Sequence, residues 1–377
     1  MAEGKQFDNA IERFTELMAE KIENLQVDWK KPWISPCATR SPRNLSGRFY
    51  NGGNSLMLMM QAEKMGYEIP VWGTFDRIVA LNTKTNDGNL PSVCVNRGER
   101  SFPVYFPSFT VINSETREKI SYDDYRNLSK EEQMQFHIYP KMQVYNVFNV
   151  VAQTNLRESR PQMYNQLLSE TAGEKRSDDL RSHPAIDMMI DEDLYFCPIR
   201  QVRGDDAYYS IQKDEIVIPH RSQFTDGESF ASNTLHECAH ATGSASRLGR
   251  LKPAAFGSSE YAREELTAEL SAAVVASRFG LTKHIKSDSA AYLKSWLDSL
   301  HESPEFLKTI LSDVKRASAM LSQRIEAVDL EISKGETADF SRFKPSSDTS
   351  QSRPDVVDDN QVAKLSPSVE THHLRMR

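Results

Sequence analysis

Two histidines four residues apart are the side chains in this sequence best suited to chemistry. His236 and His240 flank Glu237, and at this spacing on a helix two imidazoles point the same way and can bind one metal ion. Glu237 would then lie beside the metal, where it can take a proton from water and make hydroxide near neutral pH. The pattern therefore predicts a zinc site with hydrolase chemistry. By composition alone it would arise in roughly one in a hundred such chains, so the surrounding sequence has to decide.

The segments around the motif are those that such a site needs. Residues 214–219 predict a short strand, and residues 229–242 have the small and apolar spacing of a partly buried helix. A strand followed by this helix favours a zincin. Gly243 lies at the spacing seen in metzincins, but Ser246 stands where those enzymes place a third histidine. We expect Gly243 to cap the helix with a positive φ, and Cys238 to be a small buried residue.

A third ligand is expected downstream, because catalytic zinc usually takes three protein ligands and one water molecule. Residues 261–279 predict a helix whose acidic residues are Glu264, Glu265 and Glu269. Glu265 and Glu269 share a face, so we assign Glu265 as ligand and Glu269 as the carboxylate that orients an imidazole. Glu264 is turned about 100° away and is the weaker candidate. The alternative is an acidic helix face that meets only solvent.

Length and composition limit the class of protein. At 377 residues the chain is expected to form two domains. Its four cysteines show no paired spacing, which disfavours a disulfide scaffold or a cysteine-rich zinc module and favours a reducing compartment. The first residues lack the apolar core of a signal peptide, and no stretch approaches the roughly 20 apolar residues that span a bilayer. We therefore expect a soluble, cytoplasmic protein with no membrane partner.

A basic segment with interleaved aromatic residues lies near the N-terminus, although the formal net charge is −7. From residue 29 to residue 61 there is no acidic side chain. Flat rings beside cations suit single-stranded DNA, because bases stack on the rings and phosphates contact the cations. The candidate DNA-binding residues, including a second basic turn, are Trp29, Lys30, Lys31, Trp33, Arg43, Arg48, Tyr50, Arg97 and Arg100. The alternative is that the rings belong to a core and the charges to a solvated edge.

The remaining pattern predicts an α+β fold. A mixed α+β N-terminal domain is expected over residues 1–157, and a mostly helical domain with a small sheet over residues 183–340. A polar stretch, residues 158–182, is the predicted linker. Residues 341–377 are polar and Ser-rich, so they bury too little apolar surface to offset their ordering entropy and are expected to be disordered.

Individual elements of these domains are predicted as follows. Helices are expected over residues 7–25, 56–65, 290–300 and 304–330, and short strands over residues 93–96, 102–106, 109–112 and 143–148. Asn54 is the expected cap of the helix over 56–65, whose methionine cluster should belong to the core.

Several motifs, in order along the chain, resemble those of the ArdC-type antirestriction proteins of plasmids and conjugative elements. In the first domain they include Lys31-Pro-Trp33, Gly47-Arg-Phe-Tyr50-Asn-Gly-Gly-Asn54, Trp72-Gly-Thr-Phe75, Arg97-Gly-Glu-Arg100 and Val147-Phe-Asn-Val-Val-Ala-Gln153. In the second they include His236-Glu-Cys-Ala-His-Ala-Thr-Gly243, Tyr261-Ala-Arg-Glu-Glu-Leu-Thr-Ala-Glu269 and Ala291-Tyr-Leu-Lys-Ser-Trp296. The resemblance implies an N-terminal domain that binds single-stranded DNA, a zincin-like metallopeptidase domain, and a role in shielding incoming DNA from host restriction.

Together these observations predict a cytoplasmic protein of conjugative DNA entry with one zinc ion, for which manganese or cobalt could substitute. The ion is expected on His236, His240 and Glu265, with Glu237 as general base and a protein or peptide held along the preceding strand, 214–219, as an edge strand. The alternative is a non-catalytic single-stranded-DNA-binding protein in which the metal is structural. A nuclease or primase accessory factor is disfavoured, because the sequence lacks clustered Asp residues for two magnesium ions.

Overall fold

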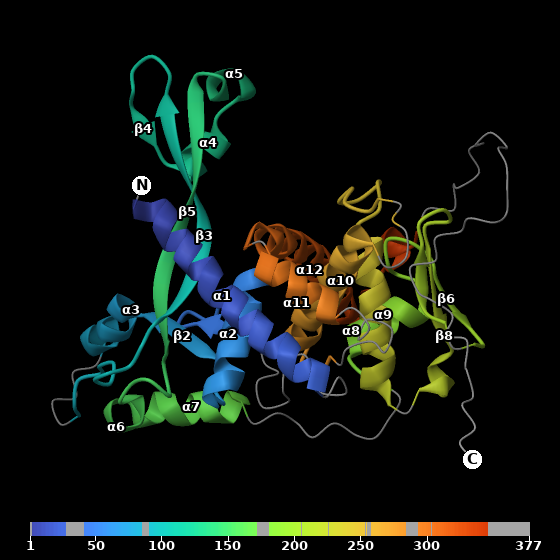
Figure 1. Cartoon of the computed structure of the whole chain (residues 1–377), viewed down its shortest axis with the longest axis horizontal. Helices are drawn as coiled ribbons and strands as arrows, with labels where there is room; N and C mark the ends of the chain where they lie inside the picture. Colours follow the sequence, from blue (N-terminus) through green and yellow to red (C-terminus); the bar gives the residue numbers. More distant parts are fainter. Residues whose placement is uncertain are drawn as a thin grey trace. The chain divides into compact units, whose positions relative to one another are not determined.

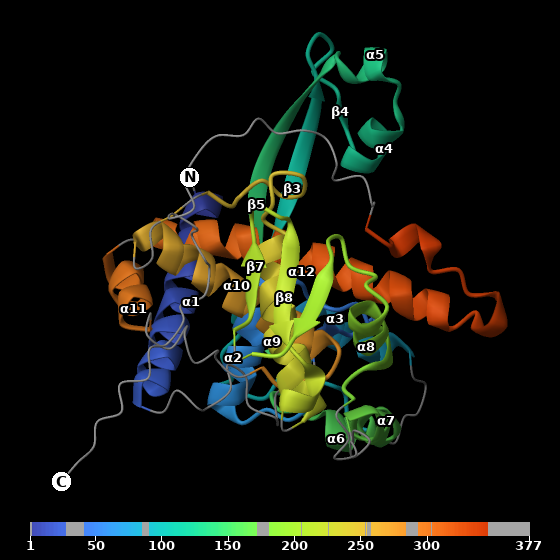
Figure 2. The same ribbon diagram turned by 90° about the vertical axis from the view of Figure 1, so that its right-hand side faces the viewer.

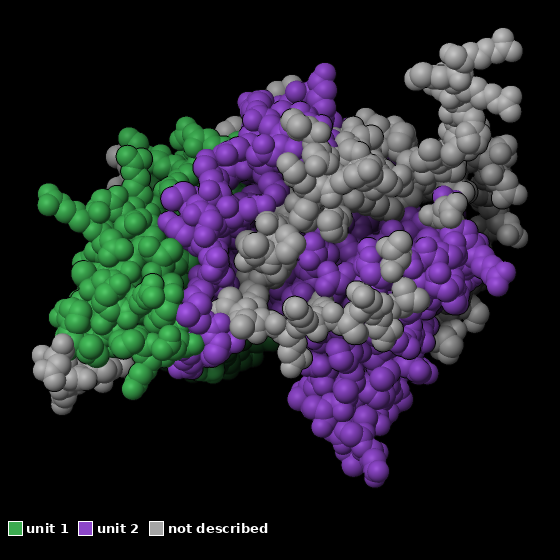
Figure 3. Space-filling view, turned by 90° about the horizontal axis from the view of Figure 1, so that it is seen from below, with its two compact units in different colours: residues 1–16, 71–165 green, residues 17–70, 166–377 purple. Residues whose placement is uncertain are grey.

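The computed structural model describes residues 2–27, 41–84, 90–171, 181–204, 206–224, 226–252, 254, 258–283, 293–302 and 304–345. The chain divides into two compact units, coloured green and purple in Figure 3. Unit 1 is formed by residues 1–16 and 71–165, and unit 2 by residues 17–70 and 166–377. The two-domain α+β prediction is confirmed. These units do not follow the predicted ranges 1–157 and 183–340, because residues 17–70 pack within unit 2.

Unit 1 is built on a long antiparallel ribbon of two strands. Strand β3 (Phe102–Asn113) pairs with β5 (Phe136–Asn149) over its whole length, from Phe102 opposite Val147 to Asn113 opposite Phe136. The strands of this unit follow the order β2-β5-β3-β4, with β2 at Val71–Thr74 and β4 at Lys119–Ile120. Figure 1 shows β3 and β5 running side by side.

Short helices complete unit 1. Helix α1 (Ala2–Val27) contributes its first turns to it, and the last turns of α1 belong to unit 2. The shorter elements of unit 1 are α3 (Phe75–Val79), the 3-10 helix η2 (Ala80–Lys84), α4 (Tyr122–Asn127), α5 (Lys130–Gln133) and α6 (Leu156–Ser159).

The strand predictions in unit 1 are partly wrong. The strands expected over 102–106 and 109–112 are the single strand β3, and the one over 143–148 is only the end of β5. Pro107 interrupts the apolar alternation in the sequence, but β3 has only β5 as a partner there, and a strand with an open side tolerates proline. Residues 93–96 make one isolated bridge, Val95 to Thr154, and are not a strand.

Unit 2 places a three-stranded sheet against a group of helices. The sheet contains β6 (Ile199–Val202), β7 (Tyr208–Ser210) and β8 (Glu215–Pro219) in the order β6-β8-β7 (Figure 2). Strand β8 therefore lies in the middle, parallel to β6 and antiparallel to β7. The prediction that the strand before the histidine motif is an edge strand is wrong, because the sequence does not reveal that β6 pairs beyond it.

Four helices of unit 2 lie close to their predicted positions. They are α9 (Gly227–Ala241), α10 (Ser259–Arg278), α11 (Leu293–Glu302) and α12 (Pro304–Ile332). A further helix, α8 (Pro184–Asp191), was not predicted. Helix α9 packs against β7, β8 and α10, and α10 packs against α12. Fully buried side chains such as Leu235 on α9, Leu270 on α10 and Leu321 on α12 form the core between them. None of the helices in the described ranges combines the length and apolar composition needed to cross a membrane.

Helix α2 (Gly52–Met65) also belongs to unit 2, where it packs against α10 and α12. Its methionine cluster is buried, as predicted. The helix begins earlier than expected, so its N-cap is Asn51 and not Asn54. Gly52 has a φ of +52° and lies against α12, where a Cβ would come within 2.8 Å of the Lys315 Cα. Glycine is needed at this close approach, because a side chain would collide with backbone.

Two segments predicted to be irregular contain structure. Residues 161–171 of the predicted linker form helix α7 (Pro161–Thr171), and residues 172–180 lie outside the described residues. In the predicted tail, Ser341–Phe343 form a 3-10 helix, and Phe343 is buried with the Arg324 guanidinium over its ring. The chain from residue 346 onward lies outside the described residues, so the disorder expected there stays a prediction.

Candidate metal centre

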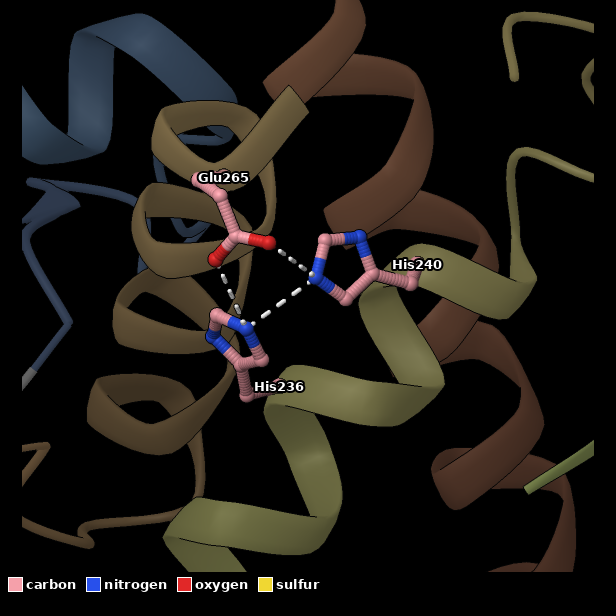
Figure 4. Close-up of side chains that lie close together, drawn as sticks. All are labelled: His236, His240 and Glu265. Carbon is pink, nitrogen blue, oxygen red and sulfur yellow. Dashed lines mark hydrogen bonds and ion pairs between the residues drawn. The ribbon is translucent and has the colours of Figure 1, made fainter. Parts of the chain in front are cut away.

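Two neighbouring helices bring together the residues that the sequence singles out. Helix α9 carries His236 and His240, and α10 carries Glu265, with all three side chains pointing toward one another (Figure 4). The Nε2 atoms of the two histidines lie 3.1 Å apart. Each Nε2 lies 3.5 Å from a different oxygen of Glu265. One ligand atom from each residue lies within 4.8 Å of the others, and all three residues are buried.

The outer nitrogen of His236 faces a second carboxylate. Nδ1 of His236 lies 3.4 Å from Oε1 of Glu269, which is fully buried on α10. The other oxygen of Glu269 accepts a hydrogen bond from the Lys283 ammonium at 2.8 Å. Lys283 is itself only 4% exposed, so the carboxylate and its cation are buried together.

The outer nitrogen of His240 also faces a carboxylate, that of Glu264. Nδ1 of His240 lies 3.0 Å from Oε1 of Glu264. Burial alone would lower the pKa of His240, but the negative charges of Glu265 and Glu264 raise it to about 10. Burial would raise the pKa of Glu265, but His240 and His236 hold it well below its usual range. The carboxylates therefore favour positive charge between the rings.

The charges around the two rings fit a divalent cation. The carboxyl groups of Glu264, Glu265 and Glu269 contact the histidines, and Glu237 adds a fourth, buried carboxyl group on α9. Arg250 and Lys283 are the neighbouring cations. With the carboxyl groups ionised and the imidazoles neutral, the cluster is two positive charges short of neutrality. Unbalanced charge is costly in a protein interior, and one divalent ion supplies the difference. Two imidazole nitrogens and a carboxylate also suit zinc or manganese.

The other residues of the motif have separate surroundings. Glu237 is fully buried on α9. Cys238 is buried too, and burial raises the pKa of its thiol well above the ordinary value, as expected of a packing residue. The expectation that Gly243 caps the helix with a positive φ is wrong, since the C-cap is Thr242 and Gly243 has no positive φ. A Cβ at Gly243 would lie 2.7 Å from Cγ of Leu251, so glycine is required there because a side chain would collide with Leu251.

The candidate DNA-binding residues differ in their exposure and contacts. Arg48, Arg97 and Arg100 are exposed, and Arg43 forms an ion pair with Glu170. The ring of Tyr50 is buried, which does not favour its predicted stacking with bases, and burial raises its pKa to about 12. Trp29, Lys30, Lys31 and Trp33 lie outside the described residues.

The sequence alone missed the groups that surround the metal centre. Arg250 and Lys283 lie beyond the ends of α9 and α10, and no motif marks them. From the sequence, Glu264 is only a weaker candidate ligand. The single available signal was its place next to Glu265, since two consecutive carboxylates on a helix point in directions about 100° apart and can contact two sides of one ring.

Comparisons with protein-family models match both halves of the chain. Residues 8–148 match the N-terminal domain of anti-restriction factor ArdC, and residues 196–310 match a zincin-like metallopeptidase. The chain is also 29% identical over 305 residues to a DNA primase TraC of Escherichia coli, covering 77% of this chain and 18% of that protein. This chain thus spans about a fifth of the length of that relative. An uncharacterized protein of Sinorhizobium fredii is 27% identical over 324 residues, covering 85% of this chain and 94% of that protein.

Two solved structures share the fold. The metal-free crystal structure of the antirestriction ArdC protein from plasmid R388 aligns with a TM-score of 0.60 and 23% identity, covering 83% of this chain and 98% of that chain. The Mn(II)-bound structure of the same protein aligns with a TM-score of 0.58 and 22% identity, covering 82% and 97%.

Proposed function

Because this chain belongs to the ArdC-type antirestriction proteins, with an ArdC N-terminal domain and a zincin-like metallopeptidase domain, we propose that it has two activities. The first is hydrolysis of a protein or peptide bond at the metal centre of α9 and α10, with zinc as the ion. The second is binding of single-stranded DNA, through which a mobile element's DNA would be protected in the recipient's cytoplasm.

The observation that carries the first activity is the convergence of His236, His240 and Glu265 within ligand distance, next to buried Glu237. A divalent ion on these three residues supplies Lewis acidity for a carbonyl group and for water. Glu237 then takes the proton from the attacking water and returns it to the leaving amine. An extended substrate would pair with an edge of the small sheet, and β7 is the edge strand that packs against α9.

The test of this activity begins with the metal content of the wild-type protein purified without chelator. We expect about one zinc or manganese ion per chain, and cleavage of at least one member of a mixed peptide library. Removal of the ion with a chelator should abolish cleavage, and re-addition should restore it. One stably bound ion with no cleavage of any library member would instead favour a structural metal in a non-catalytic DNA-binding protein.

The observation that carries the second activity is an exposed aromatic face on the β3–β5 ribbon. Phe106 is 41% exposed and Tyr145 is 39% exposed, and their rings meet edge to face at 5.9 Å. Tyr139, 50% exposed, lies on the same face, because alternate residues of a strand share a face and Tyr139 is opposite Thr110. Exposed rings of this kind are the platform on which successive bases stack.

The charge of the ribbon suits a polyanion as well. Neither β3 nor β5 contains an acidic residue, although the whole chain has 53, and Lys141 lies on the aromatic face opposite Ser108. The acidic helix α4 covers the other face, where the ring of Tyr122 stacks on Phe109 at 4.3 Å. A phosphate backbone along the aromatic face would therefore meet no carboxylate of the ribbon, with exposed Arg97 and Arg100 of unit 1 as further proposed phosphate contacts.

The double variant Phe106→Ala, Tyr145→Ala is expected to bind oligo-dT about 10- to 100-fold more weakly than wild type. The reason is that stacking of a base on an aromatic side chain contributes about 1–3 kcal/mol. Fluorescence anisotropy at fixed salt measures the change. Phe75→Ala is the matched control, because Phe75 is an exposed ring of unit 1 outside the ribbon. Equal affinities for the double variant and wild type would rule out this surface.

A further inference from the structure

The strongest remaining feature is the second carboxylate on His240. We propose that Glu264, held by Arg250, is a positioning residue that fixes the His240 imidazole for the metal ion. The inference rests on the proposed function of the centre, but it concerns metal binding and needs no turnover.

His240 lies between two consecutive carboxylates of α10. Glu265 approaches Nε2 at 3.5 Å, and Glu264 approaches Nδ1 at 3.0 Å. The turn of about 100° between successive helix residues makes Glu264 a poor metal ligand, and it also places Glu264 at the far side of the same ring. A carboxylate at Nδ1 fixes the ring orientation and the tautomer, so that the Nε2 lone pair faces the metal.

Arg250 holds this carboxylate with a two-pronged contact. Its Nε donates to Oε2 of Glu264 at 3.0 Å, and one terminal nitrogen donates to Oε1 at 2.8 Å. The same guanidinium donates to the Ala239 carbonyl at 2.7 Å and to the Thr242 hydroxyl at 2.6 Å. Ala239 and Thr242 form the C-terminal end of α9, the helix that carries His240. Arg250 thus fastens a carboxylate of α10 to the helix of the imidazole that it orients.

The close packing of Arg250 explains a residue of the motif region. A Cβ at Gly243 would lie 3.0 Å from Cγ and 3.1 Å from Cζ of Arg250, in addition to its collision with Leu251. A side chain at position 243 would therefore displace Arg250. His236 has a corresponding arrangement with Glu269 and Lys283, but at the longer Nδ1–Oε1 distance of 3.4 Å. Each imidazole is thus backed by its own carboxylate and buried cation.

Chelator competition on the full chain tests the proposal. Glu264→Ala is expected to weaken zinc affinity about 10- to 100-fold, the usual effect of losing a group that orients a ligating histidine. Glu264→Gln should lose less zinc affinity, because its amide oxygen still accepts a hydrogen bond from Nδ1–H of His240. This partial rescue would identify Glu264 as a positioning residue. The visible spectrum of the cobalt-substituted protein should shift in Glu264→Ala. Glu260→Gln is the control, since Glu260 is exposed on the same helix.

The outcomes separate this inference from the proposed function. The positioning role of Glu264 would be overturned if both Glu264 variants bound zinc within twofold of wild type and the cobalt spectrum were unchanged. A change in melting temperature alone would not support it. Arg250→Lys provides a second test, because a lysine keeps the charge but cannot contact both oxygens, so we expect weaker zinc affinity there too. If the wild-type protein bound zinc but cleaved no peptide, the proposed peptidase activity would be rejected and the positioning role of Glu264 would still stand. Wild type without metal affinity would overturn both.

Discussion

Glu237→Gln is expected to keep one metal ion per chain and to lower the rate of peptide hydrolysis about 10²- to 10⁴-fold. A positioned general base contributes this much, and an amide of the same shape cannot take the proton from water. Glu237 is fully buried, so the isosteric change preserves packing. Because the change also removes one negative charge from the cluster, metal affinity should fall somewhat while saturation at one ion remains reachable. The measurement pairs kcat with metal stoichiometry on the same preparation.

Glu228→Gln is the matched control for this prediction, because Glu228 lies in the first turn of the same helix, away from the histidines. Hydrolysis at the wild-type rate in Glu237→Gln would disprove the role of general base. Complete loss of metal from that variant would instead show that Glu237 holds the ion.

The double variant His236→Ala, His240→Ala is expected to lose most of its metal affinity, because it removes two of the three proposed ligands. Affinity should fall by at least about 10³-fold relative to wild type, since each ligand contributes strongly to a zinc site. Single-stranded DNA affinity should stay within about twofold, because the aromatic ribbon belongs to unit 1 and the histidines to unit 2. Metal titration and anisotropy on one preparation measure both quantities.

The double variant also leaves the carboxylates of Glu264, Glu265 and Glu269 without their imidazole partners, which is destabilising. Its folding has to be checked by thermal denaturation before the metal result is used. Glu265→Gln is the milder companion, since it removes one ligand charge and keeps the shape of the side chain. Wild-type metal affinity in Glu265→Gln would mean that another carboxylate of α10 is the third ligand.

The helices and the motif could be predicted from the sequence because their signals are local. The apolar spacing of Leu266, Leu270 and Val274 defines α10, and the spacing of His236 and His240 defines a shared face of α9. Glu265 could be picked out by the same periodicity, and the structure places it next to both histidines. The ArdC-type resemblance rested on several ordered motifs, and the family models confirm it.

Features that depend on long-range pairing could not be predicted. The central position of β8 depends on its pairing with β6. The residues of β6, such as Ile199 and Val202, do not indicate in the sequence which strand β6 pairs with or in which register. Lys283 reaches Glu269 only after the turn that follows α10, and nothing in the chain marks that approach. Tyr50 looked like a stacking ring because its neighbours are basic, but burial depends on which elements cover it. Residue types and their spacing indicate the chemistry of a site and the periodicity of its helices. The burial of a side chain and the pairing of strands depend on the whole fold.

The membership of residues 17–70 in unit 2 bears on how the protein can be dissected. A fragment that stops at residue 157 would carry α2 without α10 and α12, the helices against which α2 packs. The buried side chains of Leu56 to Met60 would then face water, and an apolar surface of this kind promotes aggregation. Truncation at the apparent domain boundary would thus yield an insoluble product whose failure to bind DNA reports on folding alone.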